Sequence, residues 1–133
     1  MAAAVQVTAT AKPEAIRGDH AHVYYDQNTR CKAAELRAAL GKQFDVTIGR
    51  WRDQPVGPHP QAMYQVAFGT ELFGRLVPWL MLNRHGLAIL VHPITNHDLA
   101  DHTVFPLWLG QKLSLDIDFL KKSDPQIPQE LPA

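Results

Sequence analysis

His20-Ala-His-Val-Tyr-Tyr25 is a run of aromatic and β-branched residues that predicts a β-strand early in the chain. Successive side chains of a strand point to opposite faces of a sheet. The two histidines therefore share one face with Tyr24, while Ala21, Val23 and Tyr25 share the other. An apolar strand has no structural need for imidazole, which binds metals and titrates near neutral pH. The histidine face therefore calls for a chemical explanation.

Elements further along the chain follow the pattern of one small α+β domain. A helix is predicted after the turn residues 26–29 and ends near Gly41, and a second helix begins at Thr70 and ends in residues 83–86. Three more strands are predicted, at residues 44–51, 62–68 and 87–92. The order βαββαβ predicts a ferredoxin-like sandwich with an antiparallel sheet, followed by a C-terminal extension.

The boundaries of this domain are expected at the two ends of the chain. A length of 133 residues suits one compact domain with one core, which we place at residues 18–120. Residues 1–17 show no clear period and predict a flexible leader. Residues 121–133 are polar and rich in proline, and they predict a mobile tail.

Composition narrows the class of function. The 13 basic and 13 acidic side chains cancel, which argues against nucleic acid or an anionic membrane as a partner. No apolar stretch approaches the length of a membrane span, and no signal peptide is recognisable at the start. A single cysteine, Cys31, excludes an internal disulfide. These features predict a cytoplasmic protein that acts on a small molecule.

The predicted topology brings several histidines together. The first strand lies between the third and fourth strands, and the helices cover the face that carries Ala21 and Val23. His22 then lies on the open face next to His92 of the fourth strand, and His59 lies at the entrance to the third. We therefore predict that three imidazoles from adjacent strands converge, provided that the strand register holds. The remaining open sheet favours a homodimer, or cover by residues 105–108 within one chain.

Six segments of the chain resemble a known family over about residues 18–120. The resemblance lies in His20–Tyr25, Gly49–Trp51, Pro55–Pro60, Met63–Phe68, Leu87–Pro93 and Asp98–His102 through Trp108–Gly110. They resemble the DOPA 4,5-dioxygenase family of the small fungal and bacterial type. The resemblance implies a ferredoxin-like fold and extradiol cleavage of L-DOPA or a related catechol by a metal ion and O₂.

Extradiol chemistry requires a metal with open positions, and the strands predict its ligands. The usual non-haem Fe(II) site has two histidines and one carboxylate. Here the predicted strands supply His22, His59 and His92, and no carboxylate takes an obvious strand position on that face. The site is therefore either a three-histidine site or one completed by Asp19 or Asp101 from a loop. Fe(II) is the expected metal, and zinc is possible in purified protein.

Four other residues are assigned to binding or catalysis. A second-shell histidine, His20 or His102, is a candidate base for a catechol hydroxyl. Tyr24 can hydrogen-bond the bound oxygen species or simply pack. Arg50, on the predicted second strand, can bind a substrate carboxylate or form a structural ion pair.

Two other classes of function fit the same histidines. A three-histidine zinc centre that activates water would give a hydrolase or lyase. A ferredoxin-like dimer that binds a small ligand on its sheet would need no metal. His85 and His97, in a turn and a loop, are expected at the surface.

Overall fold

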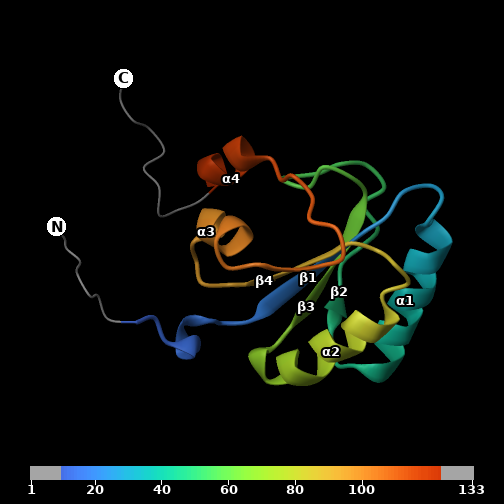
Figure 1. Cartoon of the computed structure of the whole chain (residues 1–133), viewed down its shortest axis with the longest axis horizontal. Helices are drawn as coiled ribbons and strands as arrows, with labels where there is room; N and C mark the ends of the chain where they lie inside the picture. The colour runs from blue at the N-terminus through green and yellow to red at the C-terminus, as the bar shows by residue number, and fades with distance from the viewer. Residues whose placement is uncertain (1–9, 124–133) are drawn as a thin grey trace.

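The computed structural model describes residues 10–123 and contains one antiparallel sheet of five strands in the order β2-β3-β1-β4-β5 (Figure 1). The strands are β1 (Asp19–Tyr24), β2 (Thr47–Ile48), β3 (Met63–Phe68), β4 (Ile89–Pro93) and β5 (Leu107–Leu109). The first four reproduce the ferredoxin-like order, with β1 central, and β5 adds an edge strand beside β4. The predicted α+β class and strand order are confirmed.

Helices lie on both sides of this sheet (Figure 1). The α-helices are α1 (Arg30–Gln43), α2 (Phe73–Asn83), α3 (Asp98–Thr103) and α4 (Ile117–Ser123). Two short 3-10 helices, η1 (Pro13–Ala15) and η2 (Thr70–Leu72), precede β1 and α2. Within residues 10–123, no helix combines the length and apolar character that a bilayer span requires.

The main core lies between the sheet and the pair α1 and α2. Helix α1 buries Ala33, Leu36 and Leu40, which recur at helical spacing and so form one stripe. They pack with Ala21 and Val23 of β1, both fully buried. The smaller apolar set of the first strand therefore faces the helices, as the alternation predicts, and the histidine set faces the other way.

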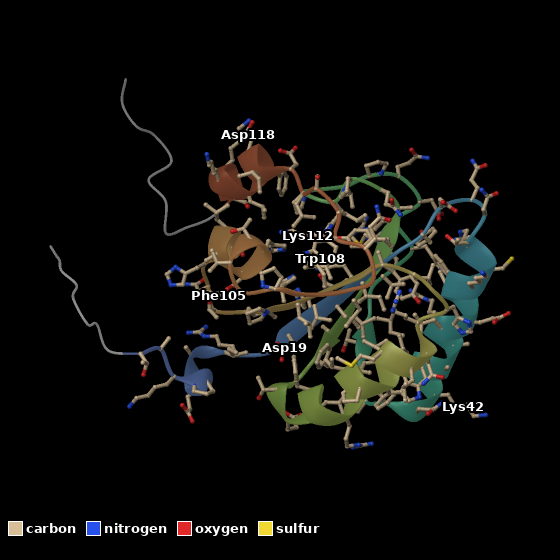
Figure 2. The ribbon with its side chains drawn as sticks, viewed as in Figure 1. Asp19, Lys42, Phe105, Trp108, Lys112 and Asp118 are labelled. Atoms are coloured by element: carbon tan, nitrogen blue, oxygen red, sulfur yellow. The ribbon has the colours of Figure 1, made fainter. Side chains whose placement is uncertain are left out.

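The opposite sheet face is covered by the C-terminal extension. Tyr24, Met63 and Leu90 form a second buried cluster on this face, against which Trp108 and Leu113 pack. Figure 2 shows Trp108 on the side of the sheet that α3 and α4 cover. The sequence predicted that this face is covered either by a partner subunit or by residues 105–108 of the same chain. In the structure, the C-terminal extension covers it within one chain.

Two local predictions are wrong. The strand expected at residues 44–51 forms only at Thr47–Ile48. Beyond it, the contact with β3 continues as a hydrogen bond from the Gly49 amide to the Gln65 carbonyl at 2.7 Å and a single bridge between Arg52 and Met63. Gly41 does not end α1. The helix continues to Gln43, and its last turn is closed by the Phe44 amide, which donates to the Leu40 carbonyl at 3.0 Å.

The predicted leader and tail lie largely outside the described residues. Residues 1–9 and 124–133 are not described, so the leader is visible only from residue 10. There, the Arg17 amide donates to the carbonyl of Ile94 at 2.9 Å, which extends the contact between the β1 and β4 segments. Residues 121–123 of the predicted tail belong to α4.

Candidate metal centre

Five histidines gather on the sheet face that the C-terminal extension covers. His20 and His22 come from β1 and His92 comes from β4, while His59 precedes β3 and His102 lies on α3. Ring centroids of neighbouring members lie 4.0 Å apart for His92 and His102, and 4.2 Å apart for His22 and His59. The predicted convergence of imidazoles is therefore observed.

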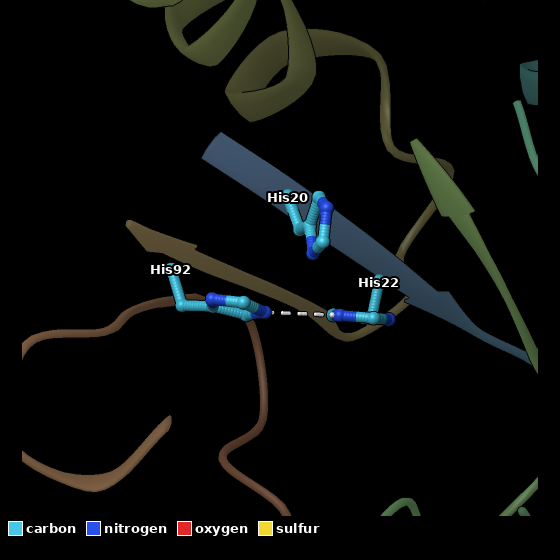
Figure 3. Close-up of side chains that lie close together, drawn as sticks. All are labelled: His20, His22 and His92. Carbon is cyan, nitrogen blue, oxygen red and sulfur yellow. Dashed lines mark hydrogen bonds between the residues drawn. The ribbon is translucent and has the colours of Figure 1, made fainter. Parts of the chain in front are cut away.

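Three of these rings can hold one metal ion. One nitrogen from each of His20, His22 and His92 lies within 4.8 Å of the other two. The strand register explains this, because His20 is directly opposite His92 and His22 is two positions along the same face. Figure 3 shows the three rings converging, with His22 Nε2 and His92 Nε2 joined at 3.1 Å.

Backbone carbonyls fix which ring nitrogens are bare. The Nδ1 atom of His92 lies 2.9 Å from the carbonyl of Pro93, and the Nδ1 atom of His102 lies 2.8 Å from the carbonyl of Asp98. A carbonyl only accepts, so each Nδ1 must carry the hydrogen, and each Nε2 keeps its lone pair. Metal-binding histidines in proteins are held by the same kind of outer contact.

Burial lowers the pKa values of the three rings that can hold a metal ion. Burial and the nearby His102 lower the pKa of the His92 imidazole to about 3. Burial, and then the neighbouring His59 and His92, hold the pKa of His22 well below its ordinary value. The pKa of His20 is also lowered, chiefly by burial. Neutral imidazoles with free lone pairs are the form that binds a metal ion.

The arrangement of the nitrogens fits a divalent ion with a preference for imidazole. Two nitrogens bound at about 2.1 Å and at a right angle lie about 3 Å apart, close to the separation of the His22 and His92 pair. His22 Nδ1 is buried and has no hydrogen-bond partner within residues 10–123. Metal binding through His22 Nε2, the nitrogen that faces His92, requires the ring hydrogen of His22 to be on Nδ1.

Neither candidate carboxylate belongs to the clustered group. Asp19 alternates with His20 on β1, so it shares the parity of Ala21 and points to the other face. Burial raises the pKa of its carboxyl to about 6. The Asp101 carboxylate is 2% exposed and accepts hydrogen bonds from both the amide and the hydroxyl of Thr95, which closes the turn after β4. Among the described residues, the group contains histidines alone.

Tyr24 and His59 form a separate pair beside the three rings. The Tyr24 hydroxyl lies 2.7 Å from His59 Nδ1, and the Tyr24 ring stacks on Trp108 with centroids 6.0 Å apart. His59 is held by a tight turn in which its amide donates to the carbonyl of Val56 at 3.0 Å. Gly57 in this turn has a φ of 58°, a conformation that favours glycine.

Three pockets include rings of the histidine cluster, and one of them, of about 600 Å³, is lined by His92 together with Asp19, Phe105 and Leu107. The other two are smaller. One of about 230 Å³ is lined by His22 and His59 together with Arg50, Arg52 and Gln65. The second, of about 380 Å³, is lined by residues of the C-terminal extension: His102, Thr103, Trp108, Lys112, Leu113, Ser114, Leu115 and Ile117. Figure 2 places Trp108 and Lys112 on this side of the sheet. The pocket of about 230 Å³ leads to the rings of His22 and His59.

All seven residues assigned from sequence lie in or beside this region, but their grouping differs in one respect. The geometry groups His20 with His22 and His92, and it sets His59 against Tyr24. The two-residue spacing of His20 and His22, which places them on one strand face, was the sequence signal for including these two histidines. Arg52 and Gln65, which share the pocket with Arg50, were not singled out. His85 and His97 are exposed, as expected.

The fold and the site together define an α+β protein whose ferredoxin-like sheet carries a buried histidine cluster suited to a metal ion. The chain belongs to the Dopa 4,5-dioxygenase family, whose family model matches residues 20–119. The family resemblance seen in the sequence motifs is thereby confirmed.

Individual relatives agree with this membership. A solved structure from Nostoc punctiforme, described as a "putative dioxygenase", is 53% identical, has a TM-score of 0.84, and is matched over 85% of this chain and 98% of that one. A DOPA 4,5-dioxygenase from Amanita muscaria is 33% identical over 86% of this chain and 54% of its own length. An uncharacterized 21.2 kDa protein from Botryotinia fuckeliana is 36% identical over 76% of this chain and 62% of its own. The chain thus spans roughly half to three-fifths of these two curated relatives.

Proposed function

We propose that this chain is a metal-dependent, extradiol-type dioxygenase that cleaves the aromatic ring of L-DOPA or a related catechol with O₂. The observation that carries the proposal is the convergence of His20, His22 and His92 within 4.8 Å at the edge of a pocket of about 230 Å³. Membership of the family and the name of the Amanita muscaria relative support the oxidoreductase class.

The three clustered histidines are the proposed ligands. The sequence-based assignment used His59 with His22 and His92, and the measured distances favour His20 in its place. Three neutral imidazoles leave the ion with its full charge, which suits an anionic catechol. A bound Fe(II) ion supplies a redox-active centre with positions for both the catechol and O₂.

The residues around the ligands orient the substrate and accept its proton. His102 is the better placed of the two candidate bases, because its Nδ1 is held by the Asp98 carbonyl and its Nε2 is left with a free lone pair. This nitrogen can accept a proton from a catechol hydroxyl. The stacked ring of Trp108 and the extension behind it shield the cluster from water.

Oxygen consumption tests the proposal directly. Metal-free protein is loaded with Fe(II) without air, and L-DOPA, protocatechuate or plain catechol is added in an oxygen electrode. We expect one O₂ to be taken up for each catechol, with formation of a yellow ring-opened product. Protein that verifiably holds Fe(II) and consumes no O₂ with any of these catechols would rule out the dioxygenase and favour a zinc-dependent hydrolase or lyase.

Arg50 is expected to determine the preference for a carboxylated catechol. It is exposed at the pocket, and no ion pair or hydrogen bond of its guanidinium is found within residues 10–123. Arg50→Ala should raise the KM for L-DOPA about tenfold, the value of one charge-assisted hydrogen bond. The KM for plain catechol, which has no carboxylate, should not change and serves as the matched control. An equal rise for both substrates would assign Arg50 to the shape of the pocket instead.

The homodimer and the cytoplasmic location stay predictions from the sequence. Several apolar side chains remain exposed along the segment between α3 and β5, with Val104 at 71% and Phe105 at 52%. Such a patch is compatible with a subunit contact.

A further inference from the structure

Two kinds of hydrogen-bond partner face the Nδ1 atoms of His59, His92 and His102, and the difference separates the roles of these rings. His92 and His102 meet backbone carbonyls, which cannot donate. His59 meets the hydroxyl of Tyr24, which can both donate and accept. The first two rings therefore present a bare Nε2, whereas the state of the His59 ring depends on which way the Tyr24 hydroxyl points.

Burial decides the direction of the hydrogen bond between Tyr24 and His59. Tyr24 is 1% exposed, and its hydroxyl has no other hydrogen-bond partner among residues 10–123. If the hydroxyl accepted from His59, its own hydrogen would be left without an acceptor in a buried site, which is unfavourable. The hydroxyl therefore donates to Nδ1.

The acceptor role of Nδ1 determines the other nitrogen of the same ring. His59 is 6% exposed and its ring lies 4.2 Å from that of His22, and a buried ring beside another imidazole is favoured in its neutral form, with one hydrogen. Since Nδ1 is bare, that hydrogen is on Nε2. His59 lines the pocket with Arg50 and His22, and its Nε2 has no hydrogen-bond partner in the described part of the chain.

We infer that Tyr24 is a positioning residue that locks His59 as the tautomer with hydrogen on Nε2, and that His59 offers this hydrogen to an oxygen of the bound catechol rather than a lone pair to the metal. For its chemical meaning this inference rests on the proposed function. Every contact that fixes the Tyr24 ring supports the lock: Trp108 stacks on it, and Met63 and Leu90 pack around it.

The tautomer can be observed without metal or substrate. Long-range ¹H–¹⁵N correlation spectra of ¹⁵N-labelled, metal-free protein distinguish a hydrogen-bearing ring nitrogen from a bare one, and His59→Gln identifies the His59 signals by their loss. We expect a bare Nδ1 and a protonated Nε2 at pH 7. A protonated Nδ1 on His59 in this spectrum would overturn the inference.

Tyr24→Phe tests whether the hydroxyl is the cause. The change removes one oxygen and keeps the ring, and it should convert the His59 signals to those of a mixture of tautomers. Tyr25→Phe is the matched control, since Tyr25 lies next in sequence but donates to Asp53 at 2.7 Å on the other side of the sheet. An unchanged His59 tautomer in Tyr24→Phe, or an equal change in Tyr25→Phe, would refute the role of Tyr24.

Kinetics separate this role from a purely structural one. In the Fe(II)-loaded enzyme, Tyr24→Phe should lower kcat about tenfold and leave the KM for the catechol and the metal content unchanged. His59→Gln retains an N–H donor at the position of Nε2 and should keep more activity than His59→Ala, with metal bound in both. Loss of metal from either His59 variant would overturn the donor assignment. If wild-type enzyme consumes no O₂, the proposed function fails, while the spectra still decide the tautomer.

Discussion

His22→Ala is expected to abolish metal binding and, with it, oxygen uptake. The His22 ring contributes the nitrogen that faces His92 at 3.1 Å, and it is 3% exposed at the centre of the cluster. Loss of an outer hydrogen-bond partner already costs about 10–100-fold in metal affinity, so loss of a ligand should cost at least 100-fold. His20→Ala and His92→Ala should behave alike.

Titration of the metal-free variants with Co(II) or Zn(II) by calorimetry provides the measurement. His85→Ala and His97→Ala are matched controls, because each removes an exposed imidazole from the same chain. Both variants should bind the metal ion with wild-type affinity. Alanine leaves a cavity at this buried position and could destabilise the fold. His22→Gln fills most of that space, so a loss of metal affinity in this variant can be assigned to the lost imidazole. A folded His22→Gln protein that binds metal with wild-type affinity would contradict the proposed ligand set.

The metal-free protein should lose stability steeply as the pH falls from 7 to 5. His22, His59 and His92 are buried and neutral, with pKa values of about 4 for His59, about 3 for His92 and well below the ordinary value for His22. In the unfolded chain these rings titrate near 6.5. Between these values the unfolded state binds more protons, so the free energy of unfolding decreases as the pH falls.

The carboxyl of Asp19 changes the free energy of unfolding in the opposite direction. The pKa of Asp19 is raised by burial to about 6, so the folded state binds the extra proton and gains stability between pH 6 and 4. His59 and His92 against this one carboxyl leave a net loss of about 2 kcal/mol between pH 7 and 5, and the lowered pKa values of His22 and His20 add to this loss. That is a large share of the roughly 5–15 kcal/mol by which domains are stable.

Urea unfolding at a series of pH values, with a chelator present, measures this slope. His59→Gln lacks one of the three buried rings and should lose less stability on acidification than wild type does. His85→Gln, which removes an exposed ring, should follow the wild-type curve. A free energy of unfolding that is constant from pH 7 to 5 would show that these rings are not held neutral.

Alternation along one strand was enough to predict which face carries the histidine cluster. His20, His22 and Tyr24 share a face because of the two-residue period, and the βαββαβ order places β4 beside them. Side-chain period and element order are properties of sequence, so the convergence of the histidines could be predicted.

The choice of ligands within the cluster could not be predicted in the same way. It depends on register, which places His20 rather than His22 directly opposite His92. It also depends on the turn at Gly57, which directs His59 toward Tyr24. A loop without a repeating pattern gives no signal for such a direction. The sequence therefore predicted the convergence of His22, His59 and His92, while the full group of five rings and the contacts within it came from the structure.

The separation of the paired histidines along the chain has a consequence for folding. His22 and His92 are 70 residues apart, and the single cysteine leaves the chain without an internal disulfide. An ion held between them would close a 70-residue loop, and a covalent bridge over such a length removes about 4 kcal/mol of unfolded-chain entropy. Until β4 has been synthesised and paired with β1, His22 and His92 cannot meet, so metal binding would follow the pairing of these two strands and act as a long-range crosslink between them.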